Sequence, residues 1–100
     1  MSKYADLQLE QQNCILSGDL HFSNVMMLLK KSIPLIDQCH ALTFDFSKVT
    51  SSDSSGLALI VEWIKLSKRQ NKPVYFKNLS KDLLAIATAA NMTQFIHNGS

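Results

Sequence analysis

A cluster of small hydroxyl side chains precedes an apolar stretch in the middle of the chain. Residues 50–55 are TSSDSS, which places five hydroxyl side chains and one aspartate in six consecutive positions. Serine hydroxyls can act as nucleophiles beside a base, bind anions at a helix start, or contact another polypeptide. They can also cap the helix that the following residues predict. Capping needs only one such residue, so it does not explain the whole cluster.

The sequence gives little support for catalysis. The three histidines, His21, His40 and His97, are far apart in sequence, and none stands in a nucleophile-elbow pattern such as GxSxG. Gly56 is the only glycine near the cluster, and no lysine follows it at the spacing of a phosphate-binding loop. The residues alone therefore disfavour a catalytic triad and a phosphate-binding loop, and we expect no metal site and no cofactor.

The composition restricts the class of protein. One hundred residues are typical of a single domain, here residues 1–100. The net charge is +2 and the basic residues are scattered, which does not indicate a nucleic-acid partner. No apolar run approaches the about 18–20 residues that span a bilayer, and residues 1–13 lack the apolar core of a secretory signal. We expect a cytoplasmic protein without direct membrane insertion, and reduced thiols at Cys14 and Cys39, although the sequence leaves a disulfide between them open.

The hydrophobic pattern predicts strands that alternate with helices. We expect strands at residues 5–12, 14–20, 40–49 and 71–79, and helices that begin near residue 24, within residues 50–56 and at residue 80. The middle helix should end near Gln70. The order β-β-α-β-α-β-α predicts an α/β domain with a four-stranded, mixed and mostly parallel sheet and about three helices.

Three local features sharpen this prediction. Pro34 lies inside the first helical pattern, so we expect a kink or an early stop there. Ser80 is a suitable N-cap for the last helix, whose buried side is expected to be Leu83, Leu84, Ile86 and Ala87. Phe95 and Ile96 in the C-terminal segment are apolar and available to pack.

The helix after the hydroxyl cluster carries apolar residues on two sides. At 100° per residue, the stripe expected to lie on the sheet is Leu57, Ile60, Val61 and Ile64. A second stripe on nearly the opposite side is Leu59, Trp63 and Leu66. A surface helix usually has one apolar stripe, so the second is either packed by a neighbouring helix or exposed to a partner. Tryptophan is enriched at interface hot spots, which favours a partner.

Three segments together resemble the STAS domain family, whose name refers to sulfate transporters and anti-sigma factor antagonists. They are SGDLHFSNV at 17–25, TFDFSKVTSSDSSGLALI at 43–60 and VYFKNLSKDLLAIATAANM at 74–92. Within the family, SGLALIVEW at 55–63 is most similar to the MlaB-like subunits of the Mla phospholipid-transport ABC systems of Gram-negative bacteria. The resemblance covers nearly the whole chain in the order of the family.

The resemblance implies a non-catalytic cytoplasmic subunit, peripheral at the inner membrane. It would bind and regulate the ATPase subunit of an ABC transporter, and through it the permease complex, in the phospholipid movement that maintains outer-membrane lipid asymmetry. Ser54 matches the hydroxyl position that is phosphorylated in anti-sigma factor antagonists, and Asp19 matches an acidic position beside the same surface. His21 departs from the residues common in the family. The expected partner-binding residues are Ser52, Asp53, Ser54, Ser55, Gly56, Leu59 and Trp63.

Two other functions remain open at this point. The same motif occurs in anti-sigma factor antagonists, which a serine kinase would switch by phosphorylating Ser54. The helix sequence LALIVEW at 57–63 favours the MlaB-like subunit. A sensor that binds a nucleotide or a lipid near the helix start is the second alternative.

Overall fold

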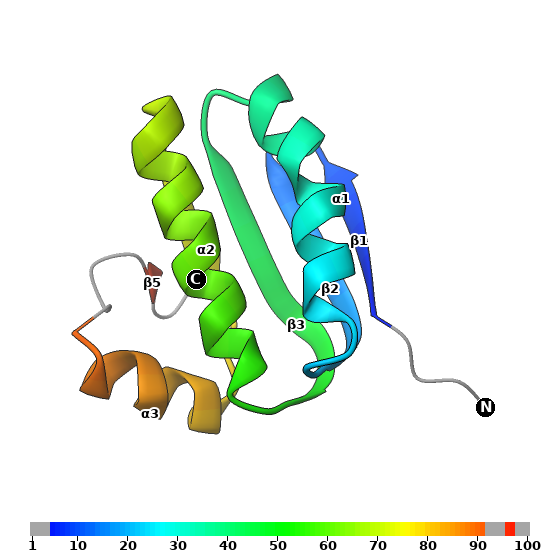
Figure 1. Ribbon diagram of the computed structural model, residues 1–100, viewed down its shortest axis with the longest axis vertical. Coiled ribbons are helices and arrows are strands. Elements are labelled where there is room, and N and C mark those ends of the chain that lie inside the picture. Colours follow the sequence, from blue (N-terminus) through cyan, green and yellow to red (C-terminus); the bar gives the residue numbers. More distant parts are fainter. Residues whose placement is uncertain (1–4, 92–95, 98–100) are drawn as a thin grey trace.

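A computed structural model describes residues 5–91 and 96–97 of the chain (Figure 1). The strands are β1 (Asp6–Glu10), β2 (Asn13–Leu20), β3 (Leu42–Ser52), β4 (Val74–Lys77) and β5 (Ile96–His97). The helices are α1 (Val25–Gln38), α2 (Ser55–Gln70) and α3 (Lys81–Ala89). The predicted order of elements up to α3 is confirmed.

The strands form one mixed sheet in the order β1-β2-β3-β4-β5. A hairpin joins β1 to β2 in antiparallel register, with Glu10 opposite Asn13 and Gln11 at a φ of 58° in the turn. The pairs β2–β3, β3–β4 and β4–β5 are parallel. The predicted α/β class with a mixed, mostly parallel sheet is confirmed, and the two-residue β5 is a fifth strand that the apolar pattern did not indicate.

Helices α1 and α2 lie side by side over one face of the sheet, and α3 crosses near the start of α2 (Figure 1). The core lies between these helices and the inward side chains of the strands, among them Leu16, Phe44 and Phe76, which are fully buried. None of the described helices is long and apolar enough to cross a lipid bilayer.

Trp63 occupies the centre of this core. Its ring stacks on Phe44 with the centroids 3.8 Å apart and the planes at 12°. Its indole N–H donates to the Ser32 hydroxyl at 2.7 Å, and Ser32 in turn donates to the carbonyl of Leu29 at 2.7 Å. These contacts join α2 to both β3 and α1, so one side chain fixes the position of three elements.

The buried face of α2 differs from the predicted one. It consists of Gly56, Leu59, Ile60, Trp63, Ile64 and Ser67. The expectation that the second stripe faces a partner is wrong for Leu59 and Trp63, which are 2% and 0% exposed. The two predicted stripes are the two sides of one broad buried face, which α1 and the sheet share.

Strand β3 is longer than predicted. It runs to Ser52, beyond the predicted end at residue 49, so Thr50, Ser51 and Ser52 belong to the strand. Parallel pairing with β2 explains this extension, because Asp19 lies opposite Ser51 and Leu20 opposite Ser52. The pairing of β2 with β3 is irregular at two places in β2, between Ile15 and Ser17 and between Gly18 and Asp19. Irregularities of this kind bend a strand and redirect its side chains.

Other local predictions have mixed outcomes. The early stop at Pro34 is wrong, since α1 continues to Gln38. Pro34 and Lys30 are exposed, so water can satisfy the Lys30 carbonyl that lacks a backbone donor. Ser80 caps α3 as predicted, but Ile86 is 39% exposed because α3 is short and only its Leu83 side reaches the core. Phe95 lies outside the described residues.

The two cysteines are free thiols. Cys14 is buried in β2, and Cys39 is partly buried after the end of α1. Burial raises the pKa of the Cys14 thiol to about 12, which keeps it protonated at neutral pH. This agrees with the expected reduced state, and a protonated buried thiol is a poor nucleophile.

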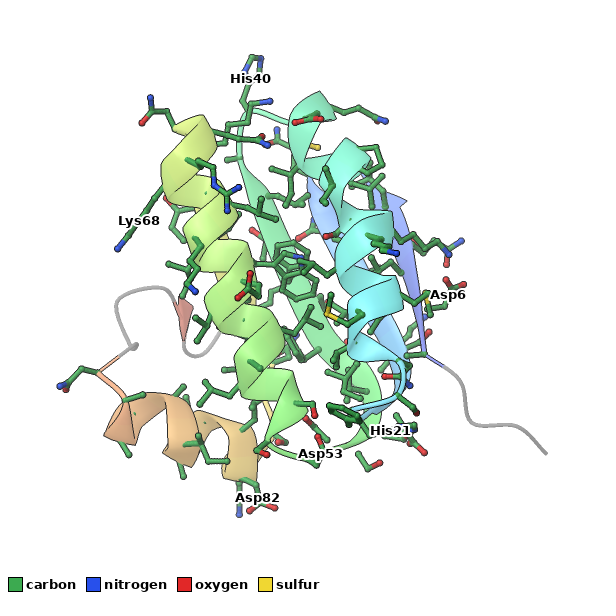
Figure 2. All side chains as sticks on the ribbon, in the orientation of Figure 1. Asp6, His21, His40, Asp53, Lys68 and Asp82 are labelled. Carbon is green, nitrogen blue, oxygen red and sulfur yellow. The ribbon has the colours of Figure 1, made fainter. Side chains whose placement is uncertain are left out.

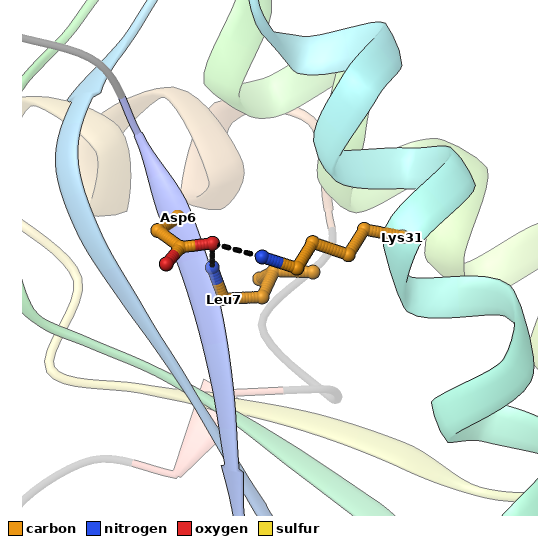
Figure 3. A network of polar contacts seen from close by, with 3 residues as sticks. All are labelled: Asp6, Leu7 and Lys31. Atoms are coloured by element: carbon orange, nitrogen blue, oxygen red, sulfur yellow. Dashed lines mark hydrogen bonds and ion pairs between the residues drawn. The ribbon is translucent and has the colours of Figure 1, made fainter.

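Helix α1 is also tied to the edge strand β1 by a surface contact (Figure 3). The Asp6 carboxylate accepts a hydrogen bond from the Lys31 ammonium and another, at 2.8 Å, from the backbone N–H of Leu7. These two donors lower the pKa of Asp6, with the lysine as the larger cause. About half of each charged side chain remains exposed, so solvent weakens the pair.

The first prediction concerns the Trp63–Ser32 hydrogen bond. Ser32→Ala leaves the indole N–H without an acceptor in the core, and the free energy of unfolding should fall by about 1–3 kcal/mol. Urea denaturation measures this change. Ser51→Ala, at an exposed position, is the control and should change stability by less than about 0.5 kcal/mol. A combined Ser32→Ala and Trp63→Phe variant should lose less than the sum of the two single changes, and strict additivity would contradict the coupling.

The second prediction concerns pH. The pKa of Asp6 lies below its unfolded value of about 3.9, so its stabilising effect is present above that pH and disappears as pH falls through the folded pKa. Asp6→Asn should therefore lower the free energy of unfolding at pH 7 by less than about 1 kcal/mol. The variant and the wild type should converge in urea denaturation near pH 2. An equal deficit at both pH values would mean that the carboxylate charge is not responsible.

Candidate functional site

The predicted site lies where β3 ends and α2 begins, and a tight turn at Asp53 joins the two elements (Figure 2). The backbone N–H of Asp53 donates to the carbonyl of Leu20 at 3.1 Å, which ties the turn to β2. The Asp53 carboxylate accepts from the N–H of Ser55 at 2.7 Å, and its carbonyl accepts from the N–H of Gly56 at 3.0 Å. Asp53 therefore satisfies backbone donors of the helix start and fixes the path of the turn.

The environment of Asp53 keeps its side chain ionised. The backbone N–H of Ser55 is the main cause of its lowered pKa, followed by the Ser55 hydroxyl. The backbone N–H of Phe22 and the nearby His21 lower the pKa further. A negative charge beside the first turn of a helix is favourable, so the carboxylate is stable in this position.

Ser54 stands at the N-cap position of α2 without acting as a cap. Its backbone is helical, with φ −63° and ψ −14°, and its side chain makes no capping hydrogen bond. The residue is exposed, while its carbonyl accepts from Leu57 and Ala58 within the helix. Because Asp53 provides the capping oxygen, the Ser54 hydroxyl projects from a rigid base toward solvent.

Gly56 allows β3 and α2 to approach each other closely. A Cβ atom at this position would lie 2.2 Å from the Ser52 hydroxyl oxygen and 3.6 Å from a methyl group of Leu83 in α3. Ser52 donates to the carbonyl of Asp53 at 3.0 Å, so its side chain also holds the turn. Of the predicted contact residues, Gly56 is buried, Ser52 and Ser55 are partly buried, and only Asp53 and Ser54 are exposed.

A second loop, between β2 and α1, lies beside this turn. Thr50 donates from its hydroxyl to the Asp19 carboxylate, which confirms that Asp19 neighbours the cluster. The buried Asn24 orders the loop, because its amide donates to the carbonyl of Asp19 at 2.7 Å and accepts from the N–H of His21 at 3.1 Å. Asn24 stands at the N-cap position of α1 without a side-chain capping hydrogen bond, and its side chain instead holds the loop that precedes the helix.

The same loop presents apolar side chains that the sequence analysis missed. Phe22 is 84% exposed and Met26, one helical turn later, is 60% exposed. Met26 also borders a shallow apolar groove between α1 and α2, whose other walls include Leu29 and Ala58. An aromatic residue between polar neighbours, as in HFS at 21–23, was the available signal, but exposure cannot be assigned without the tertiary structure.

Leu59 and Trp63 do not belong to this surface. Both were predicted partner contacts, and both lie in the core for the packing reasons given above. Phe22 is the exposed apolar residue whose backbone lies beside Asp53, and Met26 lies near α2 at Ala58.

Two of the three histidines lie at opposite ends of the part of the chain that the structure describes. His21 contacts the Ser23 hydroxyl at 2.8 Å, and His40 projects from the opposite end of the molecule (Figure 2). Among residues 5–91 and 96–97, no three histidine, cysteine, aspartate or glutamate residues gather as metal ligands would.

Comparisons with known proteins agree with this fold. A chain of the Acinetobacter MlaFEDB complex in an ATP-bound conformation superposes with a TM-score of 0.77 and 21% identity, over 92% of this chain and 97% of the other. The anti-sigma factor antagonist SpoIIAA matches in its unphosphorylated form with a TM-score of 0.75 at 15% identity, over 96% and 88% of the two chains.

The phosphorylated form of Bacillus SpoIIAA matches with a TM-score of 0.74 at 15% identity, over 96% of this chain and 91% of the other. None of the curated proteins matches the chain in sequence. A family model described as "Mlab, STAS domain" matches residues 5–97. The chain therefore belongs to the MlaB family of STAS domains.

Proposed function

We propose that this chain is a non-catalytic subunit that binds and regulates the ATPase of an ABC transporter. Through the ATPase it would join the permease complex, at the cytoplasmic side of the inner membrane. The transported molecules would be phospholipids, and the process would be the maintenance of outer-membrane lipid asymmetry. The family match and the structural likeness to a chain of the MlaFEDB complex support this proposal.

We propose the exposed Ser54 hydroxyl as the contact site for the ATPase. Asp53 caps the helix, so Ser54 is left to a partner, and both are held by backbone hydrogen bonds that restrict their motion. A partner that meets such a surface loses little conformational freedom in ordering it, which favours specific binding. The contact through Ser54 would be a hydrogen bond at the first turn of α2.

Phe22 and Met26 would supply the apolar part of the same contact. The N–H of Phe22 lies close to the Asp53 carboxylate, which places residue 22 beside the polar groups. Exposed aromatic side chains at such places commonly contribute most of the binding energy, because a partner removes them from water. We propose the contact surface as Phe22, Met26, Asp53 and Ser54.

The exposure of Ser54 also suits one alternative function, that of an anti-sigma factor antagonist. An anti-sigma factor antagonist would present the same exposed serine to a kinase, and α2 would accept a phosphate at its positive end. Incubation of the purified chain with native lysate and ATP, followed by intact-mass analysis, separates the two: stoichiometric phosphorylation of Ser54 would favour the antagonist.

The third prediction tests Ser54. Ser54→Asp adds a second negative charge beside Asp53 and removes the hydroxyl donor, and affinity for the ATPase subunit should fall at least about tenfold. Co-purification with the ATPase and surface plasmon resonance measure the loss. Ser47→Asp is the matched control, with the same chemical change at an exposed position of β3, and should bind normally. Unchanged binding by a folded Ser54→Asp variant would exclude this residue from the contact.

The fourth prediction tests the apolar part. Phe22→Ser and Met26→Ser should each raise the dissociation rate of the complex about fivefold to thirtyfold, as expected for the loss of about 1–2 kcal/mol of buried apolar contact. Ile33→Ser is the control, because Ile33 is another exposed apolar residue of α1, 38% exposed, about two turns further along. If all three variants dissociate at the same rate, the surface around Phe22 is not the interface.

A further inference from the structure

A cavity of about 240 Å³ lies beside strand β3, next to the start of α3. It lies between the second half of β3, the connection from β4 to α3, and the first turn of α3. Phe46, Val49 and Leu83 form its apolar wall, and the rest of its lining consists of serine, threonine and asparagine side chains. The proposed contact with the ATPase does not use this cavity.

The cavity exists because neighbouring strands differ in length. Strand β4 ends at Lys77 and pairs with β3 only from Leu42 to Asp45. From Lys48 to Ser52, β3 pairs with β2 on one side, and within the described residues no strand lies on the other. Backbone N–H and C=O groups on that side have no strand partner among the described residues, and backbone groups at such an edge readily bind amides and hydroxyls.

The rim of the cavity is held in place by hydrogen bonds. The Asp45 carboxylate accepts from the Asn78 amide at 3.0 Å and from the N–H of Ser47 at 2.9 Å. Asn78 has a φ of 60°, which turns the chain from β4 toward α3. The Ser80 hydroxyl accepts from the N–H of Leu83 at 3.1 Å and so retains its own proton to donate. A ligand would meet a site that is already formed, which reduces the entropy cost of binding.

The residues that line the cavity favour an uncharged ligand. None of the lining residues is a lysine, arginine, histidine, aspartate or glutamate. A phosphate or carboxylate would lose hydration without gaining a cation, which is unfavourable. Hydroxyl and amide side chains both donate and accept hydrogen bonds, and the apolar wall accommodates a nonpolar face.

We propose that this cavity is a binding site for a small uncharged molecule that carries hydroxyl or amide groups around a nonpolar face. The ligand would hydrogen-bond to the open side of β3 and to Asn78 and Ser80, with its nonpolar face on Val49 and Leu83. This site is independent of the proposed function, because it requires neither Ser54 nor the ATPase.

Nuclear magnetic resonance titration of the whole chain tests the site. The uncharged probes are glucose, for hydroxyls, and N-acetylglycinamide, for amides. At least one should cause saturable shifts of the backbone amide signals of residues 47–52 and 78–80, at millimolar concentrations. Glucose 6-phosphate should bind at least about tenfold more weakly than glucose, because the lining offers no cation to the phosphate.

Two variants complete the test. Ser47→Leu places a bulky side chain at an exposed position in the cavity and should abolish the saturable shifts. Lys48→Leu, at the next exposed residue, which does not line the cavity, should leave them unchanged. The proposal is overturned if neither uncharged probe gives saturable shifts at these residues, if the phosphorylated sugar binds as well as glucose, or if Ser47→Leu still binds.

Discussion

The Trp63 indole, stacked on Phe44 and hydrogen-bonded to Ser32, sets the rotation of α2 about its own axis. Once Trp63 points into the core, the helical period of 3.6 residues directs Gly56 inward and carries Ser54 to the outer side. The hydroxyl that the proposed function requires is therefore exposed as a consequence of a contact about two and a half turns away. A change that released the indole would disturb the surface without touching it.

The sequence predicted the elements well because each is encoded locally. The alternation of apolar and polar residues predicted β1, the apolar run after it predicted β2, and Ser80 predicted the start of α3. The orientation of α2 could not be predicted in this way, because its buried face begins with Gly56 and ends with Ser67. Small residues are not counted as apolar in a hydrophobic stripe, yet they allow the closest packing. The partner of the Trp63 N–H is Ser32, 31 residues away, and no local pattern indicates such a pair.

The end of β3 was misjudged for a related reason. The conformational propensities of single residues suggest a loop for this run of serine and threonine. Parallel pairing with β2 provides backbone hydrogen bonds that such propensities do not include. The extension has two consequences for the site. It brings Thr50 against Asp19, and among the described residues it leaves the other edge of β3 without a paired strand beyond Asp45. The proposed contact surface and the proposed cavity site thus border the same strand.

The proposed contact surface and the cavity differ in charge because different hydrogen bonds hold the aspartate beside each of them. The Asp53 carboxylate is stabilised by the backbone donors of a helix start, so its charge remains at the surface and can discriminate among partners. The Asp45 carboxylate is directed instead to Asn78 and Ser47, so its charge is used in holding the rim while the cavity lining stays neutral. In the proposed contact the Asp53 charge would face a polypeptide partner. The Asp45 charge is instead taken up by hydrogen bonds at the rim of the cavity.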